Sequence, residues 1–316
     1  MLKRFVIKLC TITILFILSY LFFVDKLAKG FVDTNYNKFT QEAGSLVLGL
    51  SRANEGISPY VIEEELKDYD FFGKPLVNFA LNEAHFGKVY YDAIKEKIIG
   101  KPGLFILSVS PGNFTAPLGL DDEKILKYDE SLTLGKIDDF TSSPNYNYII
   151  NTYGAPLYNS LHDLDQWQHR ISHQNGWNEV RLKNGRNIIT DKDIEYWKSL
   201  TFKFYNLKIK TEQLSTYRYN YFVKTIKYLK TKGEVILTRM PSDKDFLNFE
   251  NTYWGNFDFE IDSIANRYHI PYFNYSKQFN SYKTYDGSHL ESKSAKRFTK
   301  QLSKDIKVYL KGSHSK

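Results

Sequence analysis

The apolar residues of this chain form one long run near the N-terminus and a series of short runs separated by helical patterns. The long run, Phe5–Val24, has twenty residues and Lys8 as its only charge. A run of that length can cross the hydrocarbon core of a bilayer as a helix. Lys3 and Arg4 precede it and favour a cytoplasmic N-terminus, although two lysines beyond the run weaken that bias. We therefore expect a single-pass membrane anchor over residues 1–24.

A cleaved signal peptide is the alternative interpretation of this run. Cleavage would need small residues in an Ala-x-Ala-like pattern after the apolar stretch, and residues 22–26 (FFVDK) offer none. We therefore expect an uncleaved anchor, with the rest of the chain extracytoplasmic, in the periplasm or outside the cell. Cys10 lies in this run and is the only cysteine, so no disulfide is expected in the folded part.

A repeating strand–helix pattern follows a polar stalk or entry helix expected over residues 25–44. Continuous apolar runs are typical of parallel strands that are buried on both faces. Such runs predict strands at Ser45–Leu50, Pro75–Leu81, Leu104–Val109, Glu234–Thr238 and Ile270–Tyr275. Apolar residues at helical spacing predict helices within 86–98, 214–229, 261–268 and 295–309. The alternation predicts an α/β domain with a mostly parallel five-stranded sheet covered on both faces.

A long polar and aromatic interruption, from about residue 114 to residue 206, separates the third predicted strand from the fourth. A structureless loop of that length is uncommon in a compact domain. We therefore expect an inserted, partly helical cap beside the carboxyl edge of the sheet, where ligands of open α/β sheets bind. The domain is then expected over residues 45–311, with a short tail at 312–316.

Composition adds little to this picture. The net charge is +7, of which the N-terminal segment carries +3, and no basic block of the kind seen in nucleic-acid-binding proteins is present. Tyr and Phe are abundant, at 24 and 23 residues. Such residues can stack on sugar rings, although we favour the simpler explanation of a core and surface rich in aromatics.

A candidate catalytic triad comes from opposite ends of the chain. Ser51 follows the first predicted strand, and Asp286 and His289 precede the last predicted helix. A serine hydroxyl becomes a good nucleophile when a base takes its proton. His289 can be that base, and Asp286 can hold the imidazole in the required tautomer. Taken singly, the serine could make a backbone hydrogen bond and the Asp–His turn could cap a helix, but their joint placement favours a triad.

These motifs resemble those of the SGNH hydrolase superfamily, also called GDSL-like. Residues 49–51 (Gly-Leu-Ser) stand where that family has Gly-Asp-Ser, and residues 286–289 (Asp-Gly-Ser-His) match its last block. The resemblance covers the order of elements from residue 45 to residue 310, except the insertion. It implies a flavodoxin-like, three-layer α/β/α fold and an acyl-enzyme formed on the serine, without a cofactor.

The departures from the family concern the oxyanion hole. Leu50 replaces the usual aspartate, and the stretch that matches the second block, residues 77–82, lacks the glycine whose N–H binds the oxyanion. The asparagine of the third block has only a loose counterpart in Asn113. We expect the oxyanion hole to comprise Ser51, Ala80 and Asn113, with Asn78 or Asn82 as alternatives.

An anchor joined to a modified serine block also resembles extracytoplasmic SGNH-like proteins of cell-surface polymer acylation, which act with membrane-bound O-acyltransferases. That resemblance implies an esterase or O-acyltransferase that acts on acyl esters, acetyl above all, of an envelope or extracellular glycan. We expect substrate contacts from Arg52, Asn78, Asn82, Trp167 and Trp177. The alternative is a catalytically silent scaffold that binds glycan or a membrane acyltransferase.

The insertion also contains a His- and Asp-rich stretch, namely His162, Asp163, Asp165, His169 and His173. The four-residue spacing of the last two histidines would place both on one face of a helix. Zinc hydrolases with this spacing also carry a glutamate between the histidines, which is absent here. We therefore expect no metal site and interpret the stretch as part of a cap helix that lines the cleft.

Overall fold

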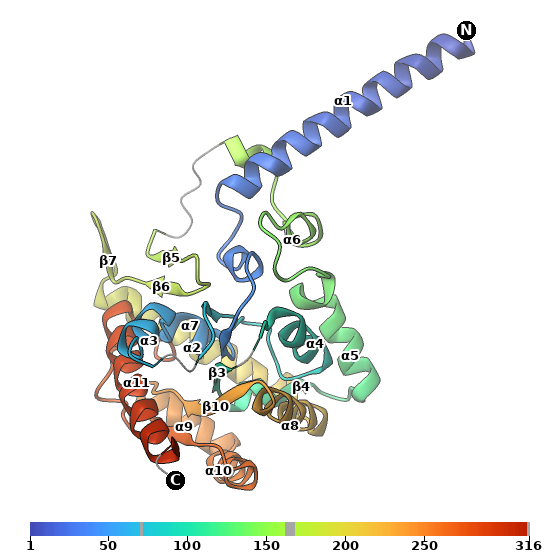
Figure 1. Ribbon diagram of the computed structural model, residues 1–316. Helices are drawn as coiled ribbons and strands as arrows, with labels where there is room; N and C mark the ends of the chain where they lie inside the picture. Colours follow the sequence, from blue (N-terminus) through green and yellow to red (C-terminus); the bar gives the residue numbers. More distant parts are fainter. Residues whose placement is uncertain (70–71, 101, 162–167, 315–316) are drawn as a thin grey trace.

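The structure, a computed structural model, describes residues 1–69, 72–100, 102–161 and 168–314. Its centre is a five-stranded parallel sheet that includes the neighbouring strands β3 and β10 (Figure 1). The strand order is β11-β10-β3-β1-β2. The strands are β1 (Ser45–Leu48), β2 (Leu76–Asn78), β3 (Gly103–Ser108), β10 (Gly233–Arg239) and β11 (Tyr272–Asn274). The predicted α/β class and five-stranded sheet are confirmed, although most of the strands are shorter than their apolar runs.

Both faces of the sheet are buried, which explains why its strands are apolar throughout. Leu46 and Leu48 point into one core and Val47 points into the other, because successive side chains of a strand face opposite sides. Each of these residues is fully buried, and burying such a side chain contributes about 1.5–3 kcal/mol. The register of β1 is therefore specified strongly, since a slip of one residue would exchange the two faces.

Different helices supply the two cores. The core that contains Leu46 includes residues of α4 (Lys88–Lys97), α8 (Thr216–Lys230) and α10 (Phe257–Tyr268). The core that contains Val47 includes residues of α2 (Ser51–Gly56), α3 (Pro59–Glu65) and α11 (Ser292–His314). The helical patterns found in the sequence therefore correspond to helices that pack on the sheet. A further helix, α9 (Lys244–Tyr253), follows β10.

The insertion is structured along most of its length. Its helices are α5 (Asp122–Ser131), α6 (Tyr146–Thr152) and α7 (Asp191–Thr211), with the short 3-10 turns η3 (Thr133–Lys136) and η4 (Leu157–Leu161). It also contains the strand pairs β5 (Arg170–Ser172) with β6 (Asn178–Val180) and β7 (Lys183–Asn184) with β8 (Asn187–Ile188). Its two ends meet where β4 (Thr115–Pro117) pairs with β9 (Glu212–Leu214). The insertion therefore ends after residue 206, at Leu214.

The helix expected around His169 and His173 is a strand instead. Residues 170–172 form β5, which pairs antiparallel with β6 across a turn at Gly176. The two histidines flank this strand, so they do not share a helical face. The other residues of the His- and Asp-rich stretch, at 162, 163 and 165, lie outside the described residues.

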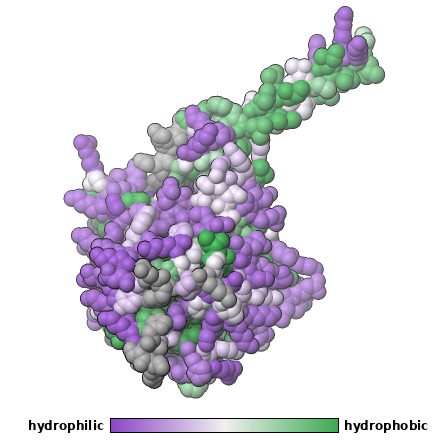
Figure 2. Space-filling view, viewed as in Figure 1, coloured by the Kyte–Doolittle hydropathy of each residue, from purple (hydrophilic) through white to green (hydrophobic). Residues whose placement is uncertain are grey.

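The N-terminal segment forms a single helix, α1 (Leu2–Lys29), which is long and apolar enough to cross a membrane. It projects from the body of the molecule with apolar side chains along its surface, whereas the body is mostly polar on the face shown in Figure 2. Its last turns are packed, because Val24 and Leu27 are buried in the core of the domain. Tyr36 and Phe39, in the turn η1 (Tyr36–Phe39), join the same core. Residues 25–44 are therefore part of the domain and not a separate stalk.

Candidate active site

The turn between β1 and α2 presents Ser51 at the carboxyl edge of the sheet. Gly49 has φ 142°, a conformation that residues with a Cβ rarely adopt. A Cβ at this position would also lie 2.8 Å from the carbonyl oxygen of Ser108. Leu50 is extended, and Ser51 is the first residue of α2. Glycine at position 49 therefore allows the chain to turn sharply from the strand into the helix that begins with the serine.

A second turn holds Asp286 and His289. Gly287 has φ 86°, and an isolated bridge between Thr284 and Leu290 closes the turn. One carboxylate oxygen of Asp286, Oδ1, accepts hydrogen bonds from the backbone N–H groups of Ser288 at 2.9 Å and His289 at 2.8 Å. These bonds leave the other oxygen, Oδ2, directed at the imidazole.

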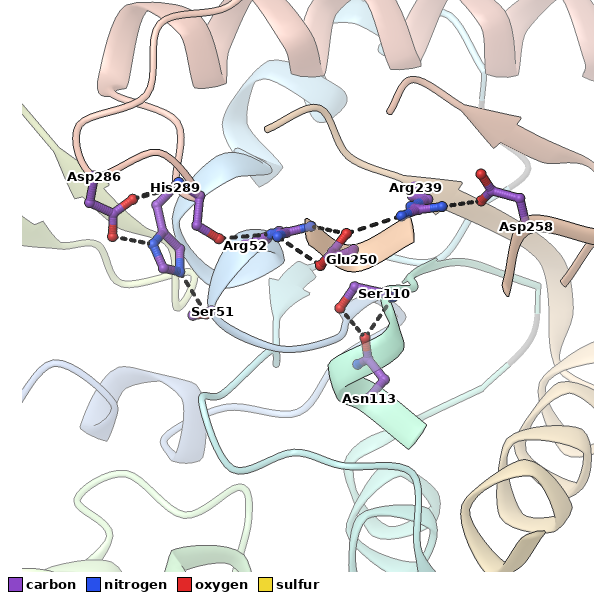
Figure 3. Close-up of polar contacts among 10 residues, drawn as sticks. Ser51, Arg52, Ser110, Asn113, Arg239, Glu250, Asp258, Asp286 and His289 are labelled. Carbon is purple, nitrogen blue, oxygen red and sulfur yellow. Dashed lines mark hydrogen bonds and ion pairs between the residues drawn. The ribbon is translucent and has the colours of Figure 1, made fainter. Parts of the chain in front are cut away.

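The two turns bring three side chains into one chain of hydrogen bonds, shown in Figure 3. His289 Nδ1 lies 2.7 Å from Asp286 Oδ2, and His289 Nε2 lies 2.7 Å from Ser51 Oγ. A carboxylate accepts hydrogen bonds only, so Nδ1 carries the proton and Nε2 presents its lone pair to the hydroxyl. This is the tautomer that a general base needs to take the proton of the serine.

The charges around the site favour this arrangement. Burial disfavours the charged form of His289, but the negative charges of Asp286 and Glu55 outweigh burial and raise the pKa of the imidazole above its ordinary value. Burial also acts on Asp286, yet the interaction with His289 and the two backbone N–H bonds hold the pKa of this carboxyl below its usual range. The aspartate therefore stays ionised and would stabilise an imidazolium at His289 if the serine gave up its proton.

Asn113 offers a donor for an oxyanion. Its Oδ1 accepts from Ser110 N–H at 2.8 Å and Ser110 Oγ–H at 2.9 Å, which fixes the orientation of the amide. Its Nδ2 is buried and has no hydrogen-bond partner among the described residues. The neighbouring Gly112 lies beside Leu50, since a Cβ at Gly112 would be 3.6 Å from Leu50 Cδ1. A buried amide without a partner calls for an explanation, and this makes Asn113 a candidate donor to a ligand.

The N–H of Ser51 is a further candidate donor, because the first N–H groups of a helix have no partner within that helix. Ala80 does not present a free donor, since its N–H donates to Asn78 Oδ1 at 3.1 Å. Asn78 is fully buried, and its Nδ2 donates to the carbonyl oxygens of Ala53 and Ile57 at 2.9 Å. Asn78 therefore ties α2 to β2, and the expected contact of its side chain with substrate is wrong.

Arg52 is also committed to the protein. Its Nε donates to Ser288 Oγ at 2.9 Å, and its Nη2 forms an ion pair with Glu250 at 2.9 Å. Glu250 bridges to Arg239 at 3.0 Å, and Arg239 pairs with Asp258 at 2.5 Å (Figure 3). The expected substrate contact from Arg52 is therefore replaced by a structural role, in which the guanidinium links the serine turn to the Asp286–His289 turn.

The other residues expected to contact substrate are Trp177, Asn82 and Trp167. Trp177 is 1% exposed, donates through Nε1 to the backbone oxygen of Glu55 at 2.8 Å and stacks on His173, so its ring does not face an open surface. Asn82 is exposed in the loop after β2. Trp167 lies outside the described residues. Among those described, no group of three or more His, Cys, Asp or Glu side chains is arranged to hold a metal ion.

Sequence reasoning missed a buried carboxylate beside the triad. Glu55, one turn after Ser51 on α2, accepts from Tyr285 Oη at 2.6 Å and pairs with Arg170 Nη2 at 2.6 Å. The ring of Tyr285 stacks on the imidazole of His289, with 5.8 Å between centroids and 23° between the ring planes. One local signal for these contacts was that Tyr285 precedes Asp286 in the sequence. The other partner of Glu55, Arg170, comes from the insertion and had no such signal.

Sequence reasoning also missed the helix that packs against the Asp286–His289 turn. On α7, Thr201 Oγ1 donates to Asp286 Oδ2 at 3.3 Å, and Lys198 Nζ pairs with Asp243 at 2.9 Å. Phe202 packs on Phe246 of α9, with 4.6 Å between ring centroids. Every side chain of α7 is nevertheless at least partly exposed. The insertion therefore contributes directly to the surroundings of the triad.

Comparisons of this chain with protein-family models, with curated proteins and with solved structures found no match.

Proposed function

We propose that this protein is a membrane-anchored serine esterase or O-acyltransferase that acts on acyl esters, acetyl above all, of a cell-envelope or extracellular glycan. The observation that carries the proposal is the hydrogen-bond chain from Ser51 Oγ through His289 to Asp286, with both links at 2.7 Å. A serine that makes only a structural hydrogen bond does not require an imidazole backed by a buried, ionised carboxylate.

The reaction follows from this geometry. Ser51 Oγ attacks the acyl carbonyl carbon while His289 Nε2 takes the hydroxyl proton, and the resulting oxyanion accepts hydrogen bonds from Ser51 N–H and Asn113 Nδ2. Collapse of this intermediate breaks the bond to the sugar oxygen, which receives the proton from His289 and leaves Ser51 acylated. Water then hydrolyses the acyl-enzyme, or a sugar hydroxyl accepts the acyl group, with His289 again acting as the base.

The fold supports a flavodoxin-like, three-layer α/β/α arrangement and, with it, the resemblance to SGNH hydrolases. The strand order β2-β1-β3-β10-β11 corresponds to the 2-1-3-4-5 order of flavodoxin-like sheets, whose ligands bind at the carboxyl edge. Ser51 follows β1 at that edge, and the Asp286–His289 turn precedes the last helix. These are the positions that the SGNH resemblance requires.

The anchor supports a location at the cell membrane with the domain extracytoplasmic. Lys3 and Arg4 flank the apolar run and favour a cytoplasmic N-terminus. Val24 and Leu27 of α1 belong to the core of the domain, so removal of the helix by a signal peptidase would also remove core side chains. A single-pass anchor that holds the site near the membrane suits a glycan substrate and a membrane-bound O-acyltransferase as partner.

The test is turnover of acetylated xylo-oligosaccharides by the purified full-length chain, with and without an unacetylated acceptor oligosaccharide. Release of acetate indicates an esterase, and acetylation of the acceptor indicates a transferase. Both activities should be lost in Ser51→Ala and kept in Ser131→Ala, which alters an exposed serine on α5. Activity that persists in Ser51→Ala would refute the proposal.

The occupied N–H of Ala80 favours a second candidate, a silent SGNH-like scaffold that binds glycan or an acyltransferase. One oxyanion donor that the family resemblance implies is engaged by Asn78, which leaves two candidate donors. Such a scaffold would bind acetylated oligosaccharides without releasing acetate, and its binding would be unchanged in Ser51→Ala.

A further inference from the structure

The apolar run of α1 and the part of α1 that packs on the domain share residues. This overlap fixes how close the domain lies to a bilayer. The apolar run Phe5–Val24 is about 30 Å long at 1.5 Å per residue, which matches the hydrocarbon core of a bilayer. Lys3 and Arg4 stand immediately before it and resist a shift of the helix further into the membrane. The membrane-spanning part should therefore end close to Val24.

The domain begins to cover α1 before that point. Tyr20 is partly buried against the core that contains Val24 and Leu27, whereas residues 2–19 are exposed. Tyr20 and Val24 are four positions apart, which is about 6 Å along the helix axis. The part of the domain that packs on this stretch must therefore lie at the level of the lipid headgroups, because no length of free chain separates it from the bilayer.

The elements at this level are α6 and η4, both of which contact α1 (Figure 1). Tyr146, the first residue of α6, donates to Asp25 Oδ1 at 3.1 Å, and Asp25 in turn pairs with Lys29 at 2.7 Å. These contacts attach α6 to the last turns of α1. The domain is therefore held against the helix and does not hang from a linker.

The elements α6 and η4, and the loop after α1, carry exposed apolar and tyrosine side chains, which we call the α1-proximal patch. Its members are Phe31, Tyr146, Ile150, Tyr158 and Leu161, with exposures between 36% and 59%. Tyr146 and Ile150 are one turn apart on α6, and Tyr158 and Leu161 lie on η4. Tyrosines are enriched at the interface of a membrane with water, where the ring is in the apolar region and the hydroxyl is hydrated.

We propose that the α1-proximal patch inserts into the headgroup region of the bilayer, so that the lipid surface is its partner and the domain has a fixed orientation on the membrane. Continuity with α1 carries this assignment, since α6 and η4 both contact the membrane-spanning helix and Phe31 follows its last residue closely in the chain. Burial of these side chains at the interface adds to the anchoring by α1, as in proteins that use two membrane signals. This inference goes beyond the proposed chemistry and does not depend on it.

The test uses the full-length chain in phosphatidylcholine–phosphatidylglycerol vesicles. Cys10 is the only cysteine, so a Cys10→Ser background accepts one engineered cysteine for an environment-sensitive NBD label. The test position is Ile150→Cys. Ile14→Cys in the middle of α1 is the control for lipid contact, and Phe259→Cys on α10, an equally apolar and 77% exposed position, is the control for water.

The proposal predicts that the label at position 150 has blue-shifted emission and is quenched by shallow doxyl-labelled lipid, whereas the label at position 14 is quenched by deep doxyl-labelled lipid. The label at position 259 should be quenched only by aqueous iodide. A label at position 150 that behaves like the label at 259 would overturn the proposal. Protection from iodide without quenching by lipid would also overturn it, because a protein partner or a second copy would then cover the patch. Absence of lipid quenching at position 14 would overturn the placement of α1 across the bilayer, on which the proposal rests.

Discussion

Replacement of Asp286 by asparagine should prevent His289 from acting as the proposed base, although the new side chain has nearly the same shape. Two backbone N–H groups, of Ser288 and His289, point at Oδ1 of this residue. In Asp286→Asn they hold the amide oxygen in the Oδ1 position, since the reversed amide would turn its NH₂ towards two donors and lose both hydrogen bonds, at about 1 kcal/mol each. The NH₂ group therefore replaces Oδ2 and faces the imidazole.

This orientation forces the wrong tautomer on His289. An NH₂ group donates, so the Nδ1 that lies 2.7 Å from it must present a lone pair, and the ring proton moves to Nε2. Nε2 then donates to Ser51 Oγ and cannot accept the proton of the serine. The corresponding change in serine proteases lowers kcat about 10⁴-fold, which is about 5.4 kcal/mol of transition-state stabilisation.

The assay is hydrolysis of p-nitrophenyl acetate by the full-length chain, with kcat/KM compared between the wild type, Asp286→Asn and Asp243→Asn. Asp243 is a nearby carboxylate that pairs with Lys198 and accepts from Thr284, so it controls for loss of charge in this region. We expect a loss of about four orders of magnitude for Asp286→Asn alone, with its thermal unfolding little changed. A kcat/KM for Asp286→Asn within about tenfold of the wild type would refute the assigned role.

Three further predictions concern the surroundings of the triad. Asn113→Ala should lower kcat for p-nitrophenyl acetate about 10²–10³-fold with KM little changed, because the Nδ2 donor would act on the transition state. Glu55→Gln should lower the pKa of His289, since the charge of Glu55 favours the imidazolium, and the acidic limb of the profile of kcat/KM against pH should move to lower pH. Glu250→Gln should lower the free energy of unfolding in urea by about 3–5 kcal/mol, because the buried Arg52 would lose its counter-charge and the buried Arg239 would keep only Asp258.

Matched substitutions at exposed positions serve as controls. Asn82→Ala should leave kcat unchanged, and Glu195→Gln on the outer face of α7 should change neither the pH profile nor the stability. An unchanged kcat in Asn113→Ala would exclude the amide from the oxyanion site. An acidic limb that stays in place or moves to higher pH in Glu55→Gln would contradict the electrostatic account. Equal stabilities of Glu250→Gln and the wild type would show that the buried ion pairs contribute nothing net.

The sheet and the grouping of Ser51, His289 and Asp286 could be predicted because their signals are local. A strand buried on both faces must be apolar along its whole length, as in β1 and β3, and such runs are visible in any sequence. Gly49 and Gly287 mark the two turns that carry Ser51 and His289, since both have positive φ. The strands are mostly shorter than the runs because apolar residues continue into the loops, as Phe79 and Ala80 do after β2.

The wrong predictions arose where a side chain fits two roles. Arg52, Asn78 and Trp177 are residue types that bind sugars and carboxylates, but here each finds its partners within the protein. Those partners come from distant segments, so nothing near each residue in the sequence indicates them. The packing of α7 against Asp286 could not be predicted for the same reason, because it depends on how the insertion folds back onto the sheet.

Covalent labelling of Ser51 tests the central claim most directly. The full-length chain is treated with a fluorophosphonate, and the modified residue is located by mass spectrometry of the digested protein. The account predicts one adduct on the peptide that contains Ser51, its loss in Ser51→Ala and its retention in Ser131→Ala. Equal labelling of Ser51→Ala, or an adduct on another residue in the wild type, would contradict the assignment of Ser51 as the nucleophile.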